Sequence, residues 1–511
     1  MTTEHYRDIL SYLRRLFRGT VWEGHVYAVG GCCRDALMGR EIKDIDLAVE
    51  RPNGGIELGQ WLFERGLTVN EPTEYPMFGT SMLRLREFPD DEIEIVQTRA
   101  EQYSDATIGD PTIVYGSKEI DALRRDLTVN ALYHDISADR LLDLLGTSAH
   151  DIEHHIVRTP VDPVSTFEDD PVRILRAIRL AARYGWPIQE ETLHGMRSSF
   201  NRIRGTRPHR IMAELERILL CDYVDRALEL MRDTGVLTFL FPELEPLFTL
   251  DQNQNYGCTS WEHTLQVIKR CPADLTVRMA ALLHDAGKPK AAHRGRDGKI
   301  RFTGHERQGR GLIHASLRRL YCDRDFIDRV IFLVANQKAT AKWGPEAENM
   351  TDEKLRMLQF RCQSPERFGR LMALIDADNH SFAQGHGMPL QVEHILRRSD
   401  ELRRNETALF HFRRQLPDAK VRKLKGLPAG TDMTPYHEFL FKLALTAPEL
   451  PVEEVRRRLR KFTPQQKSAP KHPPEAKPKR PSRHKPTPDT PAESKPKKHR
   501  SRKPRRKPGK Q

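Results

Sequence analysis

The chain has 511 residues, and its 84 Lys and Arg against 71 Asp and Glu give a formal net charge of +13 at pH 7. This length is expected to form several domains. No stretch approaches the roughly 20 apolar residues of a membrane span, and the N-terminus lacks an apolar signal core. Seven scattered cysteines, two of them adjacent at Cys32 and Cys33, favour reduced thiols in a cytosol over a disulfide framework. We therefore expect a cytoplasmic protein with no membrane partner.

The first predicted chemical element is a glycine turn followed by two spaced carboxylates. Gly30 and Gly31 have no Cβ, so the backbone there can approach a triphosphate closely. Asp44 and Asp46 lie two positions apart in an apolar run, and residues two apart on a strand point to the same face. Such a carboxylate pair suits Mg²⁺, which also takes oxygens from substrate phosphates.

A third carboxylate is expected from the alternating stretch over 92–99. Glu94 is our candidate, so that Asp44, Asp46 and Glu94 together would hold Mg²⁺ for phosphoryl transfer assisted by two metal ions. The alternative is an exposed acidic strand edge. The glycine turn and the carboxylate pair upstream favour the metal site.

These residues resemble the signature of class II nucleotidyltransferases of the DNA polymerase β superfamily, which comprise CCA-adding tRNA nucleotidyltransferases and bacterial poly(A) polymerases. The family pattern G-G-x-V-R-D-x-L-L-G-R, followed by D-x-D, is matched by residues 30–46. Cys33 stands where the family usually has Val, and a small buried Cys replaces a small hydrophobic residue readily. The resemblance implies an α/β head with a polymerase β-like palm. It also implies that the triphosphate is contacted by Gly30, Gly31 and Arg34.

A second family pattern, R-R-D-x-T-x-N-A, is matched by residues 124–131. In the family this motif recognises the ribose of the incoming nucleotide and steadies its phosphates. Carboxylates and amides suit sugar hydroxyls, and arginines suit phosphate oxygens. The residues implied here are Asp121, Arg124, Arg125, Asp126 and Asn130.

The third pattern, E-D-x-x-R, is matched by residues 169–173, with Asp169 in place of the usual Glu. The resemblance implies that Asp170 and Arg173 pair with the base edge of the incoming nucleotide. The same residues also read as a helix start, with an Asp cap, Pro171 as the first helical residue and Gly185 as the C-terminal cap. Arginines recur every three residues, and this stripe would either be a solvated face or contact the primer backbone. It consists of Arg173, Arg176 and Arg179.

The head is predicted to span 1–148 and to be followed by a helical neck over 149–250, with helices over 175–184 and 211–220. We expect the neck to carry the templating motif and to bind the RNA end. Beyond it the predicted fold is all-helical, with an HD domain over 251–385 and a tail over 386–464. Helical sequence over 421–427 and 452–462 supports the tail.

The segment over 251–385 resembles HD metal-dependent phosphohydrolases, which use a His, a later His-Asp pair and a distal Asp. The implied ligands are His263, His284, Asp285 and Asp378, with Asp376 as the alternative distal residue and His305 as an additional ligand. Such a donor set suits Mn²⁺, Ni²⁺ or Fe²⁺, whose bound water could hydrolyse a phosphate ester. Asn336-Gln337 stands where many HD proteins have a further His, which favours one metal ion. A fold retained without activity is the alternative.

Residues 465–511 hold 17 of the basic and 3 of the acidic residues, so the rest of the chain has 67 basic and 68 acidic residues. This Pro-, Lys- and Arg-rich segment has too few apolar residues to form a core and is predicted to be disordered. Its expected role is salt-dependent attraction to RNA phosphates. A merely solubilising extension is the alternative.

Together the motifs predict a template-independent RNA nucleotidyltransferase. The 3′-hydroxyl of an RNA would attack the α-phosphate of a nucleoside triphosphate and release pyrophosphate. The favoured substrate is tRNA lacking all or part of its CCA end, with CTP and ATP, because relatives with an HD domain are usually tRNA enzymes.

Several alternatives stay open. The basic tail favours a poly(A) polymerase acting on RNA 3′ ends, and an A-only or CC-only adding enzyme would share all these motifs. An HD phosphohydrolase that uses the head as an RNA-binding module is a further hypothesis, and a non-catalytic RNA-binding protein is another. The oligomeric state is left open.

Overall fold

The computed structural model describes residues 1–103, 111–251, 258–382, 387–403, 411–447 and 450–464. The chain divides into two compact units, Met1–Glu406 and Thr407–Gln511. The predicted disordered segment 465–511 lies outside the described residues. Among the helices that are described, none is both long and apolar enough to cross a membrane.

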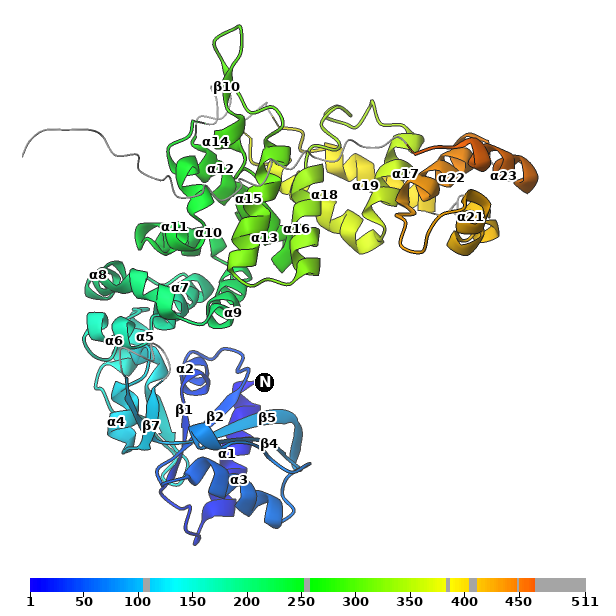
Figure 1. Ribbon diagram of the computed structural model, residues 1–511. Coiled ribbons are helices and arrows are strands. Elements are labelled where there is room, and N and C mark those ends of the chain that lie inside the picture. Colours follow the sequence, from blue (N-terminus) through cyan, green and yellow to red (C-terminus); the bar gives the residue numbers. More distant parts are fainter. Residues whose placement is uncertain (104–110, 252–257, 383–386, 404–410, 448–449, 465–511) are drawn as a thin grey trace, which may run out of the picture. The chain divides into compact units, whose positions relative to one another are not determined.

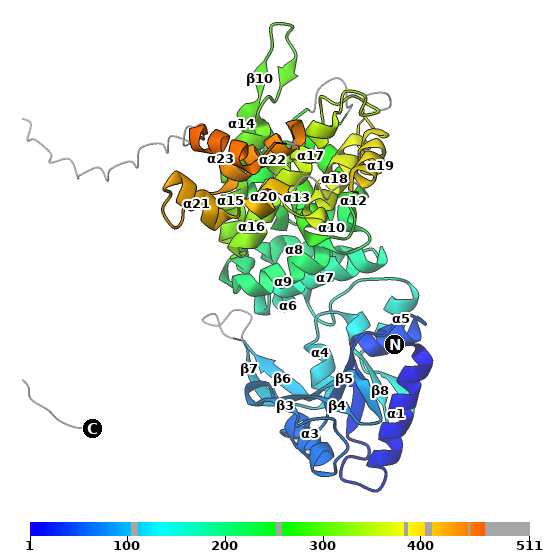
Figure 2. The ribbon, with the colours of Figure 1, turned by 90° about the vertical axis from the view of Figure 1, so that its right-hand side faces the viewer.

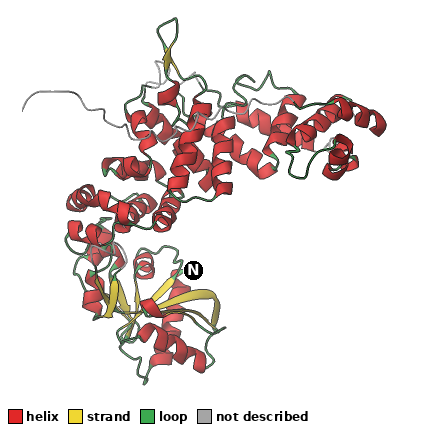
Figure 3. Ribbon diagram, viewed as in Figure 1, coloured by secondary structure: helices red, strands yellow, loops and turns green. Residues whose placement is uncertain are grey.

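The first unit begins with a mixed sheet, shown at the blue end of the ribbon in Figure 1 and as yellow arrows in Figure 3. Its seven strands have the order β3-β4-β5-β2-β1-β8-β9. They are β1 (Val26–Val29), β2 (Ile45–Val49), β3 (Thr73–Tyr75), β4 (Thr80–Leu85), β5 (Phe88–Gln97), β8 (Leu132–Asp135) and β9 (Arg140–Asp143). The helices around it are α1 (Thr3–Phe17), α2 (Gly31–Leu37), α3 (Gly54–Glu64), α4 (Lys118–Leu123) and α5 (Ser148–Glu153). A separate hairpin pairs β6 (Arg99–Gln102) with β7 (Thr112–Tyr115).

The two faces of this sheet have different surroundings because side chains alternate along a strand. Ile45, Leu47 and Val49 of β2 enter the main core with apolar residues of α1 and α3. The opposite face has a smaller apolar cluster that includes Ala48. Asp46 lies on this second face, so the predicted metal ligands are kept out of the main core.

The register of the sheet places two of these carboxylates side by side. β2 and β5 run parallel, and Asp46 is paired with Glu94. The neighbouring pairs Ile45–Ile93 and Leu47–Ile95 point into the core, which fixes the register because a slip of one residue would bury the carboxylates. The predicted alternation over 92–99 is therefore confirmed as far as Gln97, where β5 ends.

The remainder of the first unit is mostly helical, as predicted. Its elements are α6 (Pro163–Asp169), α7 (Val172–Tyr184), α8 (Glu190–Ser199), α9 (Pro208–Leu219), α10 (Val224–Asp233), α11 (Val236–Leu240), α12 (Ser260–Arg270), α13 (Leu275–Leu283), α14 (Lys288–Ala291), α15 (His305–Arg319), α16 (Arg324–Asn336), α17 (Asp352–Cys362), α18 (Pro365–Asn379) and α19 (Gln391–Arg403). The second unit contains α20 (His411–Gln415), α21 (Asp418–Lys425), α22 (Thr434–Thr446) and α23 (Val452–Lys461) around its own apolar core.

One hairpin contradicts the prediction of an all-helical chain beyond the head. Strands β10 (His293–Arg294) and β11 (Ile300–Arg301) pair in antiparallel fashion, and the hairpin projects from the helices in both Figure 1 and Figure 2. The turn contains Asp297-Gly298, with Gly298 at a φ of 77°, and such a pair is a strong hairpin signal. Two-residue strands are too short for an alternating pattern to reveal them.

The helix after the third motif begins one residue later than expected. Pro171 is the N-cap of α7, and the Asp170 carboxylate accepts a hydrogen bond from the backbone N–H of Val172 at 3.2 Å. The C-terminal cap agrees with the prediction, because Gly185 adopts the left-handed conformation with a φ of 71°.

Candidate functional site

Three carboxylates lie on the open face of the head sheet. Asp46 and Glu94 are register partners on parallel strands, and Asp44 precedes β2 on the same side. Burial and the nearby Glu94 carboxylate raise the pKa of Asp46 to about 6, although Arg125 opposes the shift. Desolvation also raises the pKa of Glu94, to which Asp44 contributes. Burial and neighbouring carboxylates thus disfavour the charged forms of Asp46 and Glu94, and a bound divalent cation would stabilise those charged forms.

The carboxylate oxygens of these three side chains do not all lie within 4.8 Å of one another. Within the described ranges, only a histidine-containing group elsewhere in the chain brings three ligand atoms within 4.8 Å of one another. The oxygen donor set nevertheless fits Mg²⁺, which binds proteins through one or two carboxylates and completes its shell with water and phosphate oxygens.

The glycine turn adjoins this carboxylate group. Gly30 has a φ of 78° and a ψ of −134°, a conformation that side-chain-bearing residues rarely adopt. A Cβ at this position would lie 3.3 Å from Nη1 of Arg125 and 3.5 Å from Oδ2 of Asp46. The turn, a carboxylate and a guanidinium therefore adjoin one another, and the absence of a side chain at residue 30 leaves space between them.

Cys33, the departure from the family pattern, is a core residue. Its side chain is buried, and its thiol donates to the carbonyl of Ala28 at 3.1 Å. This agrees with the expected substitution for a small hydrophobic residue.

The second motif forms a network around the fully buried Asp121. Its carboxylate accepts hydrogen bonds from Arg124 at 2.6 and 2.9 Å, from Arg125 at 3.0 Å and from the Tyr133 hydroxyl. Burial alone would raise the pKa of Asp121, but the two guanidinium groups outweigh it and hold this pKa well below its ordinary value. In this structure Asp121 thus orients the two arginines.

Asp126 and Asn130 form the second half of this network. The Asp126 carboxylate accepts from the Asn130 amide at 3.1 Å and from Nε of Arg176 at 2.6 Å. The side-chain oxygen of Asn130 in turn accepts from Arg34. The Arg34 guanidinium lies over the Tyr184 ring, 5.2 Å from the ring centre. The predicted triphosphate-contacting arginine and the predicted sugar-contacting amide are therefore joined directly.

The two key side chains of the third motif have different partners. Asp170 accepts from Arg210 of α9 at 2.7 Å, whereas Arg173 donates to Glu101 at 3.1 Å and to the Tyr103 hydroxyl at 3.0 Å. Asp170 precedes α7 and Arg173 lies in its first turn.

The predicted arginine stripe on α7 is neither a solvated face nor without partners. Arg173 pairs with Glu101, Arg176 with Asp126, and Arg179 with Glu214 at 2.6 Å. Two of these pairs connect α7 to the elements of the head. The Tyr184 hydroxyl adds a third connection by donating to Asp35 at 2.7 Å.

Sequence reasoning missed several of these partners. They are Glu101, Tyr103, Tyr133, Tyr184, Arg210 and Glu214. Glu101 accepts hydrogen bonds from Arg99, Arg124 and Arg173, so it is as central to the site as any predicted residue. The only sequence feature that pointed to Glu101 was the short alternation Arg-Ala-Glu after β5, and such alternation is common on strands.

The HD-like segment assembles a second group of ligands. His263 of α12, His284 after α13 and Asp378 of α18 each present a ligand atom within 4.8 Å of the others, with His263 Nε2 3.0 Å from Asp378 Oδ1. The Ala281 carbonyl accepts from Nδ1 of His284 at 2.6 Å, which leaves the lone pair on Nε2. Asp376 pairs instead with His380 at 3.4 Å. Of the two predicted distal carboxylates, the structure brings Asp378 to the histidines.

Asp285 and His305 border this group without joining the closest three. The Asp285 carboxylate lies 2.6 Å from Nζ of Lys288, 3.2 Å from His284 Nε2 and 3.4 Å from His305 Nε2. Gln337 donates to His305 Nε2 at 3.2 Å. An amide thus lies beside His305, in the Asn336-Gln337 segment where the sequence lacks the further histidine of many HD proteins.

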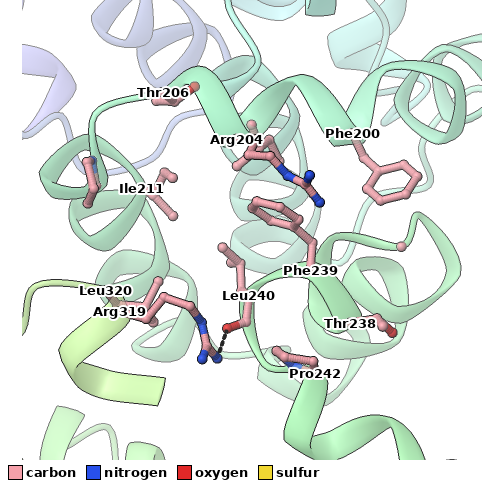
Figure 4. A pocket seen from close by; sticks show the side chains of 13 residues that line it. Phe200, Arg204, Thr206, Ile211, Thr238, Phe239, Leu240, Pro242, Arg319 and Leu320 are labelled. Atoms are coloured by element: carbon pink, nitrogen blue, oxygen red, sulfur yellow. Dashed lines mark hydrogen bonds between the residues drawn. The ribbon is translucent and has the colours of Figure 1, made fainter. Parts of the chain in front are cut away.

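A cavity of about 830 Å³ lies among the neck helices, away from both groups (Figure 4). Phe200, Phe239 and Leu240 give it an apolar lining, and the Arg204 guanidinium lies 5.6 Å from the Phe239 ring centre. Arg319 of α15 closes one side and donates to the Leu240 carbonyl at 3.1 Å. None of the predicted site residues lines this cavity.

The chain is similar to families and proteins of known description. Residues 26–158 match the family described as "Poly A polymerase head domain", and residues 185–248 match "Probable RNA and SrmB- binding site of polymerase A". A Multifunctional CCA protein of Pseudomonas paraeruginosa is 31% identical over 367 residues, which cover 69% of this chain and 84% of that protein. One from Neisseria gonorrhoeae is 34% identical over 274 residues, covering 52% and 62%.

The fold is also similar to solved structures. The crystal structure of the Bacillus stearothermophilus CCA-adding enzyme in complex with CTP matches with a TM-score of 0.59 and 19% identity, covering 89% of this chain and 97% of that chain. A CCA-adding enzyme in its apo form II matches with a TM-score of 0.58, also at 19% identity, covering 89% and 95%. At this identity the likeness establishes a shared fold.

Proposed function

Because the chain belongs to the family of CCA-adding enzymes and poly(A) polymerases and is a nucleotidyltransferase, we propose that it adds CCA, or part of it, to tRNA 3′ ends from CTP and ATP. The observation that carries this proposal is the meeting of three features at Gly30. Its backbone, the Asp46 carboxylate and the Arg125 guanidinium adjoin one another, and Glu94 lies beside Asp46. A triphosphate needs close backbone approach, a metal-binding carboxylate and a fixed cation at one place.

Residues of the head would have the following roles in the reaction. Asp44, Asp46 and Glu94 hold Mg²⁺, which when bound activates the attacking hydroxyl and neutralises the departing pyrophosphate. Gly30, Gly31 and Arg34 contact the triphosphate. The attacking oxygen of the RNA 3′-hydroxyl bonds to the α-phosphorus while the bond to the bridging oxygen of pyrophosphate breaks. Arg125, already fixed by Asp121, needs no reorganisation to meet the phosphate charge.

Base selection is assigned to Asp170 and Arg173. Both side chains have hydrogen-bonding partners before any nucleotide binds, namely Arg210 for Asp170 and Glu101 for Arg173. An incoming base would therefore have to displace Arg210 from Asp170 and Glu101 from Arg173. Carboxylate and guanidinium groups have the donors and acceptors to pair with the edge of cytosine or adenine.

We would test this function with purified protein and tRNA transcripts that end before CCA, after C and after CC. Addition of C, C and A followed by arrest supports the proposal, and addition of only C or only A identifies one part of a divided pathway. A long A ladder on any RNA identifies a poly(A) polymerase, the alternative favoured by the basic tail. Glu94→Gln should abolish extension, while Glu92→Gln, two residues earlier on the same strand, should retain it. No extension by the wild type would overturn the proposal.

A second activity is supported by the histidine group. We propose that His263, His284 and Asp378, with Asp285 beside them, bind one Mn²⁺, Ni²⁺ or Fe²⁺ ion and hydrolyse a phosphate ester such as a cyclic phosphate on a nucleotide. Among the residues that the structure describes, no donor satisfies the buried His284 Nε2. Two imidazoles with a carboxylate suit a transition metal.

Asp378→Asn and Asp376→Asn provide a matched pair for this second activity, because the two residues lie on one helix and only Asp378 joins the group. Metal analysis should find one ion per chain in the wild type and in Asp376→Asn, and far less in Asp378→Asn. Hydrolysis of a 2′,3′-cyclic nucleotide should follow the metal content. Metal without hydrolysis would mean a retained but inactive site, and equal metal in all three proteins would contradict the assignment.

A further inference from the structure

The outer face of helix α15 is rich in arginine. Its exposed residues include three arginines and a histidine at relative positions i, i+3, i+7 and i+11, which share one side of a helix. We call this set the basic face. It consists of Arg307, Arg310, His314 and Arg318.

The opposite side of α15 explains why these residues face solvent. His305, Gly309, Ile313 and Leu317 recur every four residues and are buried. Gly287 allows the close packing of α15, since a Cβ at Gly287 would lie 2.6 Å from the Gly309 backbone nitrogen. The packing of α15 thus leaves the basic face outward.

Within the part of the chain that the structure describes, no ion pair joins any of the four members of the basic face to a carboxylate. Helix α23 behaves differently, because its exposed Arg456 and Arg457 pair with Glu453 and Glu454. Cations spaced three and four residues apart repel one another on a helix, and an anionic partner would remove that repulsion.

The β10–β11 hairpin, which immediately precedes α15, carries charge of the same sign. Arg294, Arg296, Lys299 and Arg301 are exposed on it, against the single carboxylate of Asp297, which pairs with Arg301 at 2.9 Å. The hairpin projects from the helices in both views (Figures 1 and 2). Arg296 and Lys299 thus add two further cations at its turn.

The C-terminal end of α15 borders the cavity among the neck helices. Arg319, the residue after the basic face ends, lines that cavity (Figure 4). Most of the other lining residues fall within 185–248, the segment that matches an RNA-binding description. The basic face is therefore continuous with a region similar to known RNA-binding sequence.

We propose that the basic face and the hairpin bind the phosphate backbone of the RNA whose 3′ end is extended. This inference rests on the proposed function, because the RNA is its substrate. From Arg307 to Arg318 the helix rises about 16 Å, enough to span several successive phosphates. Arginine forks match phosphate oxygens. A membrane surface fits less well, because such helices carry a large apolar face beside the cations and α15 buries its apolar residues.

The test uses the full chain with Arg307, Arg310 and Arg318 changed together to Ala. Its matched control changes Arg7, Arg15 and Arg18 to Ala, which removes the same charge from exposed positions of the head. A third protein with Lys at the three α15 positions keeps the charge. Affinity for a labelled tRNA transcript lacking CCA is measured by fluorescence anisotropy over a series of KCl concentrations.

We expect the Ala variant to bind the transcript roughly tenfold more weakly at about 100 mM salt and to lose about two units from the slope of log K against log salt. Its kcat at saturating RNA and its melting temperature should match the wild type. The head control and the Lys variant should retain most of the affinity and slope.

Two results would overturn the proposal in distinguishable ways. If the wild type binds and extends RNA but the Ala variant equals the head control in affinity and slope, the basic face does not bind RNA. Binding of vesicles containing anionic lipid that the Ala substitutions abolish, with RNA affinity unchanged, would assign the surface to a membrane and likewise refute it. If the wild type neither binds nor extends RNA, the proposed function fails and this inference fails with it.

Discussion

At the scale of single residues, Asp46 links the metal site to pH. Its pKa of about 6 lies above the ordinary value of an aspartate because burial and Glu94 disfavour its charge. The folded, metal-free chain therefore gains relative stability when this group is protonated. That contribution is fully present below about pH 4 and is lost as the pH rises through about 6.

Replacing Asp46 with Asn should remove the free-energy cost of the buried negative charge. The amide carries no charge, so metal-free Asp46→Asn should be more stable than the wild type at pH 7.5 by roughly 1–3 kcal/mol, while losing extension activity. Thermal unfolding of both proteins at pH 5 and pH 7.5 measures the effect. The difference in stability should shrink at pH 5, and an equal difference at both values would contradict the assigned pKa.

Mg²⁺ and a proton compete for the same carboxylate. The Mg²⁺ concentration that gives half-maximal extension should therefore rise about tenfold for each pH unit below about 6. Extension rates measured over a Mg²⁺ series at several pH values test this. A half-maximal concentration that stays constant between pH 5 and 7 would exclude Asp46 as the titrating ligand.

Glu101 is the second residue with a clear expected effect. Its nearly buried carboxylate accepts from Arg99, Arg124 and Arg173, so Glu101→Gln leaves three guanidinium groups around a neutral side chain. Breaking a buried ion pair by removing one partner costs roughly 3–5 kcal/mol. We expect a loss of that order in the free energy of unfolding of the first unit, measured by urea denaturation. Glu92→Gln, whose pair with Arg84 is exposed, should change it by less than about 1 kcal/mol.

At the scale of elements, the turn between β1 and α2 depends on a residue without a side chain. Gly30→Ala would place a methyl group 3.3 Å from Arg125 in a backbone conformation that alanine rarely adopts. We expect extension to fall roughly 100-fold, since small displacements in a reacting site have effects of that size. Gly24→Ala is the control, because Gly24 also has a positive φ but has no atom within 4 Å of the added methyl. Equal activity of the two variants would contradict a positional role for Gly30.

The sequence predicted most of the elements that carry the site. Alternation identified the strand with Glu94, and apolar periodicity identified α7 and α9, because burial of one face leaves a regular trace along the chain. Partners distant in sequence left no such trace. Glu101 and Arg173 are 72 residues apart, and only the folded sheet and neck bring them together. The hairpin β10–β11 was missed for a different reason, since its strands have two residues each.

At the scale of the whole molecule, the excess charge is concentrated at the C-terminal end. Deleting residues 465–511 removes a net charge of +14 from a chain that is otherwise close to neutral. We expect the truncated protein to bind RNA more weakly at low salt and with a flatter salt dependence, and to keep its kcat at saturating RNA. Filter binding from about 50 to 200 mM KCl measures this. Unchanged binding throughout that range would assign the segment a merely solubilising role.

The pairing of Asp170 and Arg173, the residues proposed to select the base, has a consequence for changing nucleotide preference. Arg210 of α9 donates a hydrogen bond to Asp170, which connects the start of α7 to a second neck helix. Arg173 donates to Glu101 and Tyr103, which connects the neck to the head. A single substitution chosen to alter base recognition would leave the partner with an uncompensated charge. Altered specificity should therefore be reached through paired changes, with Asp170 and Arg210, or Arg173 and Glu101, exchanged together.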